Sequence, residues 1–162
     1  MKKFLSLIFL CFALHGFSQD VKEQMDDRAG YFTFCSKKYL ITAECDPGRK
    51  KENHVCSDQV SMSWKYYKTE KEAKIDFESQ AARLEEDVKN FRKEFTNVLM
   101  LDKEVNAFKI SFDAQDGSRQ YRILCYGNVN GQMVLVELNA AKELLRNKDI
   151  PASLRQIVSL TN

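Results

Sequence analysis

The sequence is poor in the residues on which most catalytic sites depend. Only two of its 162 residues are histidine, and His54 is the sole histidine after residue 18. It contains no G-x-S-x-G, no H-E-x-x-H and no phosphate-binding glycine loop. A Ser-His-Asp or Cys-His arrangement would therefore depend on His54 alone. We expect no catalytic residues, no metal and no cofactor. The enzymatic alternative is a paired-carboxylate hydrolase, for which the acids near expected strand ends are Asp102, Glu104, Asp113, Asp116 and Glu137.

Proline and glycine are also scarce, with two prolines and six glycines in the whole chain. The sequence has no Pro/Gly-rich linker, no internal repeat and no low-complexity tract. The length after residue 29 suits one domain with its own hydrophobic core. We therefore predict a single α+β domain over residues 30–162, preceded by a polar leader over residues 19–29.

The one long apolar run lies at the N-terminus. Lys2 and Lys3 precede apolar residues 4–14, and small residues follow at Gly16 and Ser18. This order is typical of a secretory signal peptide over residues 1–18, and the run is too short to span a bilayer. A lipoprotein anchored at Cys11 is the alternative, but Leu10 stands where a small residue is needed. We expect an exported protein, periplasmic or secreted, with no membrane span.

The charges balance once that segment is removed. The chain has 25 Lys+Arg and 23 Asp+Glu, and residues 1–18 take away two lysines and no acid. A chain with 23 charges of each sign has no overall field that would attract a polyanion. We therefore expect no nucleic-acid partner.

Four cysteines remain after residue 18, and an even number in an exported chain indicates disulfides. Of the three possible pairings we favour Cys45–Cys56, which closes a short loop, and Cys35–Cys125, which ties two strands together. The first pairing would present the basic residues Arg49, Lys50 and Lys51, and leave His54 exposed in the loop. A zinc site at Cys45, His54 and Cys56, with Asp46 or Asp58, is the alternative, but its spacing matches no usual paired-ligand pattern.

Periodicity separates strands from helix. Short aromatic and β-branched runs at residues 31–35 and 39–45 predict a hairpin. Alternation over residues 59–67 predicts a half-buried strand with Val60, Met62, Trp64 and Tyr66 on one face. Between Thr69 and Phe95 an apolar stripe at spacings of three and four predicts one long amphipathic helix, with Thr69 and Glu72 as a capping box. Its members are Phe77, Ala81, Leu84, Val88, Phe91 and Phe95.

The second half of the chain resembles an antiparallel meander. Alternation predicts strands over residues 97–105, 106–114, 119–129 and 132–139, and Asn130-Gly131 predicts a type I′ hairpin turn. A short helix is expected over residues 140–146. A closing helix capped by Asp149 should then pack on the core through apolar residues, namely Ile150, Leu154, Ile157 and Val158. The fold class is α+β, a mainly antiparallel sheet with one long amphipathic helix and a C-terminal helix packed on it.

This order of elements resembles the PsbP-like fold. The resemblance rests on the strand GYFTF, the long helix before a meander, the run FKISFDAQDGSRQYRILCYGNVNGQMVLVEL and the closing segment IPASLRQIVSL. It covers nearly all of the chain after residue 18 and matches no diagnostic motif. The resemblance implies a binding or accessory role without catalysis, and it carries over no functional residues.

Three functions remain open. The first is an exported protein–protein interaction module, such as an inhibitor, a toxin-immunity protein or an envelope accessory subunit. Its binding residues would be Arg49, Lys50, Lys51 and His54 of the loop with the tyrosines Tyr39, Tyr67 and Tyr126. The second is a carrier of an apolar ligand lined by phenylalanines. The third is the carboxylate hydrolase. The first interpretation, with an unidentified protein partner in the cell envelope or outside the cell, is the one we adopt.

Overall fold

A computed structural model describes residues 30–41 and 53–161 of the chain. The expected signal peptide, the leader, Cys45 and the basic residues Arg49, Lys50 and Lys51 lie outside these ranges. The elements in chain order are β1 (Gly30–Phe34), β2 (Lys37–Ile41), β3 (His54–Ser57), β4 (Val60–Tyr67), α1 (Glu70–Asp87), β5 (Lys89–Met100), β6 (Lys103–Asp113), β7 (Arg119–Val129), β8 (Gln132–Ala140), the 3₁₀ turn η1 (Asn147–Asp149), α2 (Ala152–Arg155) and β9 (Val158–Leu160).

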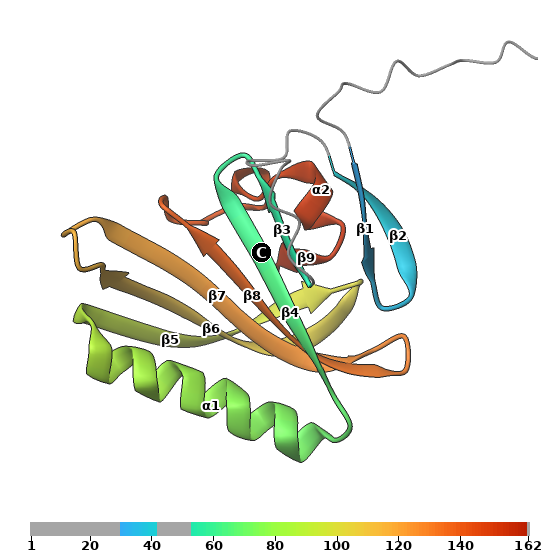
Figure 1. The fold of residues 1–162 in the computed structure, drawn as a ribbon, viewed down its shortest axis with the longest axis horizontal. Coiled ribbons are helices and arrows are strands. Elements are labelled where there is room, and N and C mark those ends of the chain that lie inside the picture. Colours follow the sequence, from blue (N-terminus) through green and yellow to red (C-terminus); the bar gives the residue numbers. More distant parts are fainter. Residues whose placement is uncertain (1–29, 42–52, 162) are drawn as a thin grey trace, which may run out of the picture.

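Seven strands form one sheet in the order β3-β4-β8-β7-β6-β5-β9, and every neighbouring pair is antiparallel. Strands β1 and β2 form a separate two-stranded hairpin. Figure 1 shows α1 running along one side of the sheet, with the hairpin and α2 on the other. The predicted fold class, α+β with a mainly antiparallel sheet, is confirmed. None of the described helices is long and apolar enough to cross a membrane.

Helix α1 covers one face of the sheet. The Thr69 hydroxyl accepts a hydrogen bond from the Glu72 backbone N–H, and the Glu72 carboxylate accepts one from the Thr69 N–H, each at 3.2 Å. This is the predicted capping box, and it fixes where the helix begins. Ala73, Phe77 and Ala81 are buried against the sheet. Phe77 stacks on Phe108 of β6 with ring centroids 4.2 Å apart.

The predicted extent of this helix is wrong at its C-terminal end. The helix stops at Asp87, Val88 is extended, and Asn90 has a φ of +52°, so the chain turns there into β5. Phe91 and Phe95 therefore lie on a strand and not on the helix. β5 pairs with β6 at ten positions, and these backbone hydrogen bonds with the cross-strand contacts outweigh the helical propensity of a local stripe.

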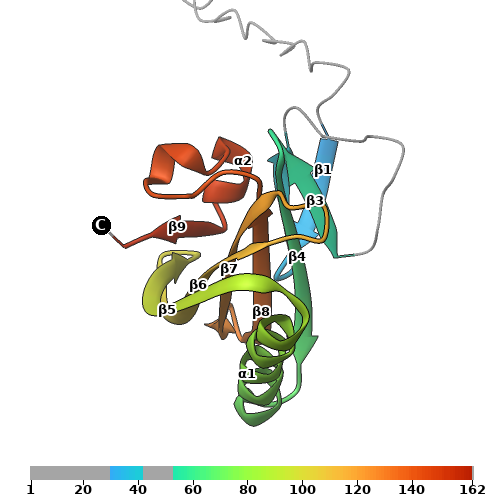
Figure 2. The same ribbon diagram turned by 90° about the vertical axis from the view of Figure 1, so that its left-hand side faces the viewer.

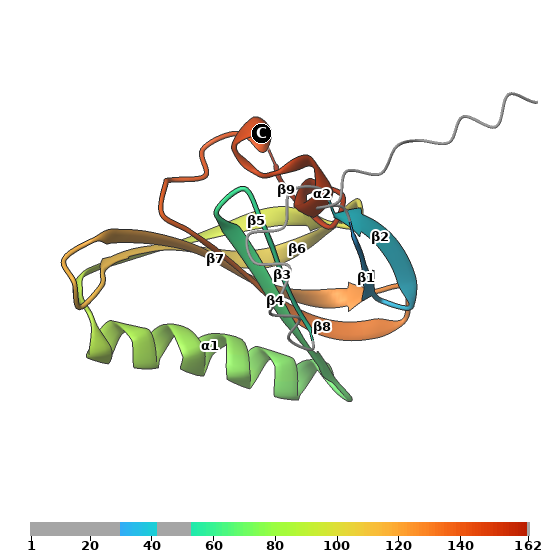
Figure 3. The same cartoon turned by 45° about the horizontal axis from the view of Figure 1, so that its top comes forward.

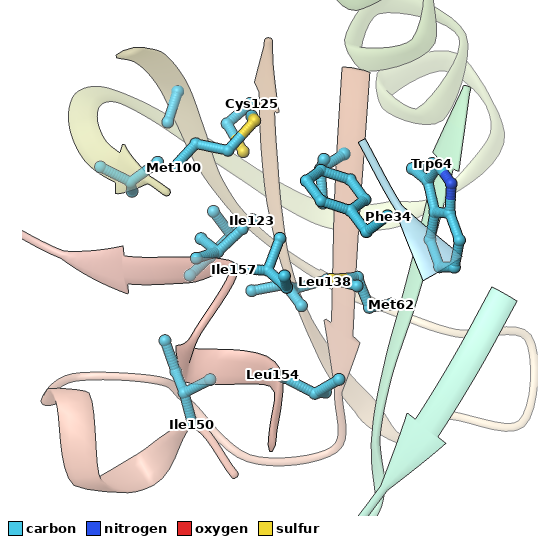
Figure 4. Packing of buried hydrophobic residues seen from close by; sticks show 14 of the residues in the cluster. Phe34, Met62, Trp64, Met100, Ile123, Cys125, Leu138, Ile150, Leu154 and Ile157 are labelled. Atoms are coloured by element: carbon cyan, nitrogen blue, oxygen red, sulfur yellow. The ribbon is translucent and has the colours of Figure 1, made fainter. Parts of the chain in front are cut away.

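The larger core lies on the opposite face of the sheet. Figure 4 shows its centre, where Phe34 and Trp64 lie beside Met62 and Leu138, with α2 below. The inner side of the hairpin contributes Phe34 and Ile41, both fully buried. The rings of Phe34 and Trp64 meet edge to face with centroids 5.6 Å apart. Figure 3 shows the hairpin and the C-terminal segment lying on this same side of the sheet.

The two-residue hairpin turns share one backbone geometry. Asn130 and Gly131 have φ values of +50° and +76°, which confirms the predicted type I′ turn. Three further turns place two successive residues at positive φ without glycine or asparagine, and the sequence gives no signal for them: Cys35-Ser36, Asp58-Gln59 and Leu101-Asp102. The second of these joins β3, a strand that the sequence analysis did not predict, to β4.

The C-terminal segment differs from its prediction in two places. Residues 140–146 form no helix, because the end of β8 continues to Ala140 and the chain then runs irregularly. The Asp149 carboxylate accepts hydrogen bonds from the backbone N–H groups of Leu145 at 3.2 Å and Arg146 at 2.8 Å. It therefore caps the η1 turn and not a long helix. The four apolar residues expected to pin this segment to the core, Ile150, Leu154, Ile157 and Val158, are buried as predicted.

The closing helix is only four residues long, and the chain ends in strand β9 instead. β9 pairs with the last three residues of β5, Val98–Met100. The outer side of β9 is bonded to the Asn147 side chain, which accepts from the Leu160 N–H at 2.7 Å and donates to the Leu160 carbonyl at 3.1 Å. One side chain therefore replaces a neighbouring strand at the end of the sheet.

Candidate functional site: the free edge of strand β5

The four predicted binding residues that the structure describes do not form one surface. Tyr39 is half-buried on β2 and its ring packs 5.7 Å from Phe32. His54, expected in an exposed loop, is half-buried on β3, because the alternating residues 54–57 pair with β4. Tyr126, expected to be a binding residue, is 6% exposed under α1, with its ring 4.8 Å from Phe77. The expectation of an exposed His54 was wrong, and Tyr126 presents little surface to a partner.

Tyr67 and Tyr126 do line neighbouring hollows at the N-terminal end of α1. A hollow of about 580 Å³ has Tyr67 in its wall, and one of about 430 Å³ has Tyr126. They share the wall residues Glu70, Asn128 and Met133. Both hydroxyls already have partners, since the Asn106 amide donates to Tyr126 at 3.5 Å and Tyr67 donates to Asp76. The hydroxyl groups of both tyrosines are therefore already used in contacts within the chain.

Tyr67 belongs to a polar cluster that joins β4 to α1. Its hydroxyl donates to the Asp76 carboxylate, which also accepts from Gln80 at 3.1 Å and Lys65 at 3.3 Å. Burial and the bond to Asp76 raise the pKa of Tyr67 to about 12. Burial alone would raise the pKa of Asp76, but the hydrogen bonds from Tyr67, Gln80 and Lys65 outweigh it, so that pKa is lowered.

Replacing Tyr67 with phenylalanine is expected to lower the free energy of unfolding by about 1 kcal/mol at pH 7, since one charge-assisted and partly screened hydrogen bond is lost. A carboxyl group with a depressed folded-state pKa stabilises the fold above its unfolded pKa, and this is lost as pH falls through the folded value. The difference between the wild type and Y67F should therefore shrink in urea titrations taken from pH 6 down to pH 2. An offset that does not change with pH would assign the loss to packing.

The predicted Cys35–Cys125 disulfide is not formed in the structure. Both residues are free thiols and both are buried. Cys35 lies in the β1–β2 turn, where its N–H donates to the Tyr66 hydroxyl at 2.8 Å. Cys125 lies in the middle of β7 between Ala107 and Val136, and burial raises the pKa of its thiol to about 12. The expected pairing of Cys45 with Cys56 stays a prediction, because Cys45 lies outside the described residues.

The acids considered for a hydrolase site are spread over strand ends and turns. Glu137 pairs with Arg122 at 3.2 Å. Glu104 accepts from Asn97 at 2.6 Å. Hydrogen bonds from Asn90 and Arg119 hold the pKa of Asp113 below its usual range, and bonds from Ser118 do the same for Asp116. Asp102 lies in the β5–β6 turn. The lowered pKa values keep Asp113 and Asp116 ionised. Among the residues that the structure describes, no cluster of His, Cys, Asp and Glu suits a metal ion.

The best-defined open feature is the outer edge of β5. This strand is 12 residues long, and β9 pairs with only its last three residues. No described strand lies beside residues 91–96 on that side. Figure 2 shows β5 at the edge of the sheet nearest the viewer, with α1 below it and β9 above. We call the outer side of Phe91–Thr96 the free edge. Its unpaired backbone groups can hydrogen bond to an added strand.

One face of the free edge is aromatic. Phe95 is 62% exposed, although its ring meets Phe108 edge to face at 6.0 Å. Phe91 is half-buried on the same face. The ammonium group of Lys93 lies over the rings of Phe91 and Phe108, 5.9 Å from the centre of the first and 5.3 Å from the centre of the second. It also pairs with Glu85 of α1 at 3.8 Å. An added strand would cover Phe95 with its own side chains.

The other face of the free edge is charged and leads into a cleft of about 250 Å³. Arg92 and Glu94 of β5 form its rim. Lys109, Ser111 and Tyr121 line it from β6 and β7, and Glu143 lines it from the segment after β8. Because successive side chains of a strand alternate between faces, an added strand would meet the aromatic face and the charged cleft in turn.

Sequence reasoning missed this site because it read Phe91 and Phe95 as helical. The order of the strands, which makes β5 nearly an edge strand, is also not encoded in any local pattern. A scan against protein-family models and a search of curated proteins both found no match for this chain.

Proposed function

We propose that this protein is an exported, non-catalytic binding module that captures an extended segment of a partner protein by strand addition at the free edge. The observation that supports this most directly is the exposed Phe95 within six successive β5 residues, 91–96, that have no neighbouring strand on their outer side among the described residues. In strand addition, backbone hydrogen bonds supply affinity, and contacts with alternate side chains supply specificity.

The charges on β5 fit this function better than a purely structural edge. Natural edge strands carry lysine and other charges that prevent uncontrolled pairing. Lys89, Arg92, Lys93 and Glu94 supply such charges here. Phe95 interrupts them with a large apolar side chain that forms only a partial contact. An edge that repels most strands and still presents an apolar anchor favours selective pairing.

The alternatives have less support. A carrier of an apolar ligand would need space between the sheet and α1, but Phe77 and Phe108 fill that space by stacking on one another. A hydrolase would need two converging carboxylates, whereas four of the five candidate acids are bonded to neighbouring side chains or backbone at different strand ends and turns. Export to the periplasm or medium, an inhibitor or immunity role, and the likeness to the PsbP-like fold stay proposals, and all of them agree with a binding module.

A displayed library of extended peptides tests this function. We expect selected peptides to carry apolar residues at alternate positions and to protect the outward-facing backbone N–H groups of the free edge, which belong to alternate residues, from hydrogen exchange. Phe95→Ala should weaken their binding at least about fivefold, since truncating an interface anchor costs more than about 1 kcal/mol. Tyr31→Ala is the matched control, because Tyr31 is an aromatic residue that is 60% exposed on β1 of the separate hairpin. Peptides that bind F95A and the wild type equally would contradict the proposal.

A further inference from the structure

The charges and aromatic residues of the free edge are arranged symmetrically about Lys93. Arg92 and Glu94 flank it on the charged face, and Phe91 and Phe95 flank it on the aromatic face. In the sequence Phe-Arg-Lys-Glu-Phe, a phenylalanine therefore stands two residues to each side of the central lysine, and residues of opposite charge stand next to it. If two such segments pair antiparallel, each positive charge lies opposite a negative one and each phenylalanine lies opposite a phenylalanine.

We propose that a second copy of this chain occupies the free edge, with the two β5 strands paired antiparallel about a two-fold axis at Lys93. The proposal rests on the proposed function, because it uses the same edge and names its occupant. In this register Arg92 lies opposite Glu94 of the other copy, and Phe91 lies opposite Phe95. Each contact occurs twice, as two-fold symmetry requires. The two seven-stranded sheets become continuous.

Other registers are less favourable in the pairing of charges and in side-chain direction. Residues directly opposite in an antiparallel pair point to the same face, so a shift of one residue in the pairing would bring aromatic side chains to the charged side. Moving the axis to Glu94 would place two glutamates together. Moving it to Arg92 would place two arginines together. Only the axis at Lys93 pairs opposite charges on one face and rings on the other.

With the axis at Lys93, the Lys93 side chains of the two copies also lie opposite one another. This contact costs less than it would between free lysines, because Glu85 lies 3.8 Å from each ammonium group and the rings of Phe91 and Phe108 lie beneath it. The length of the pairing follows from the fold. β9 occupies the edge from Val98 onward, and the positive φ of Asn90 ends the regular strand on the other side.

Sedimentation equilibrium on the purified protein tests this assembly. We expect a monomer–dimer equilibrium in which Arg92→Glu and Glu94→Arg each weaken the dimer about tenfold, since two attractive pairs become repulsive. The double variant R92E/E94R should restore the wild-type constant, because the charges again oppose one another. Unchanged circular dichroism shows that each variant is folded. A protein that stays monomeric at all concentrations, or a dimer insensitive to these changes, would overturn the proposal.

A cross-link fixes the register. Lys93→Cys should form a covalent dimer through position 93 under mild oxidation, because the two residues face one another across the axis. Thr96→Cys should not, because it lies opposite Asn90. Mass mapping of the linked peptides distinguishes a disulfide at position 93 from one that involves the native cysteines.

If the chain is monomeric but selected peptides still bind at residues 91–96, the dimer proposal fails and the proposed function stands. If the Lys93→Cys cross-link forms and no foreign peptide binds, the dimer stands and the proposed function fails.

Discussion

Replacing Phe77 with alanine is expected to lower the free energy of unfolding by about 3–5 kcal/mol, the usual cost of truncating a buried phenylalanine. Phe77 is 3% exposed and stacks on Phe108 at 4.2 Å, and its ring also packs on Tyr126 at 4.8 Å. These contacts fasten α1 to the centre of the sheet. The cavity left by the ring lies between two layers that cannot easily collapse onto it, so the loss should be near the upper end. Urea unfolding followed by circular dichroism measures it.

Ile75 provides the matched control for this prediction. It lies two residues away on the same helix and is 56% exposed. Ile75→Ala should change stability by less than about 0.5 kcal/mol, since little buried surface is removed. If both variants cost the same, helix propensity and not the contact with the sheet would explain the loss at Phe77.

The second large effect is expected at Gly127 on β7. A Cβ at this position would overlap Cγ1 of Val105 and lie 3.1 Å from its Cβ. Both residues belong to neighbouring central strands, where the backbone is held by pairing on each side. Gly127→Ala should therefore cost about 1–3 kcal/mol through overpacking.

The test of this cause is the same substitution in a Val105→Ala background. Alanine lacks the methyl group that the new Cβ would meet, so the cost of Gly127→Ala should fall by at least about 1 kcal/mol there. Thermal or urea unfolding of the four proteins in the cycle gives the coupling. Equal costs in both backgrounds would show that backbone conformation, and not contact with Val105, requires the glycine.

The meander was predictable because its signals are local and agree with one another. Phe108, Ile110 and Phe112 alternate along β6 and share the face that α1 covers. Asn130-Gly131 has the backbone freedom that a type I′ turn requires, and the turn forms there. In such segments the side-chain period and the turn chemistry indicate the same structure.

The end of α1 was not predictable from the apolar spacing. A separation of four residues, as between Phe91 and Phe95, keeps two side chains on one face of a helix and also on one face of a strand. The periodicity therefore could not distinguish the two. Asn90 was the available signal, because asparagine is among the few residues that accept a positive φ after a helix.

The candidate site could not be predicted because it depends on long-range pairing. Whether β5 is central or peripheral is decided by where β9 docks, and that strand comes from the end of the chain. The sequence analysis instead favoured tyrosines. In the structure, Tyr67 donates a hydrogen bond to Asp76, and Tyr126 packs under α1. The hydroxyl group of a tyrosine does not predict whether the side chain will be exposed or buried.

The position of β4 has a consequence for the order in which the chain folds. β4 precedes α1, yet it pairs with β8, so that Val60 faces Ala140 and Tyr67 faces Met133. Strands β5 to β8 are joined by short turns and close at little cost in chain entropy. β4 can join the sheet only after β8 is in place, and β9 pairs with β5 at the opposite end of the sheet. Contacts of such wide sequence separation slow folding. We therefore expect the β5–β8 meander to form first, and β4 and β9 to add later at its two ends.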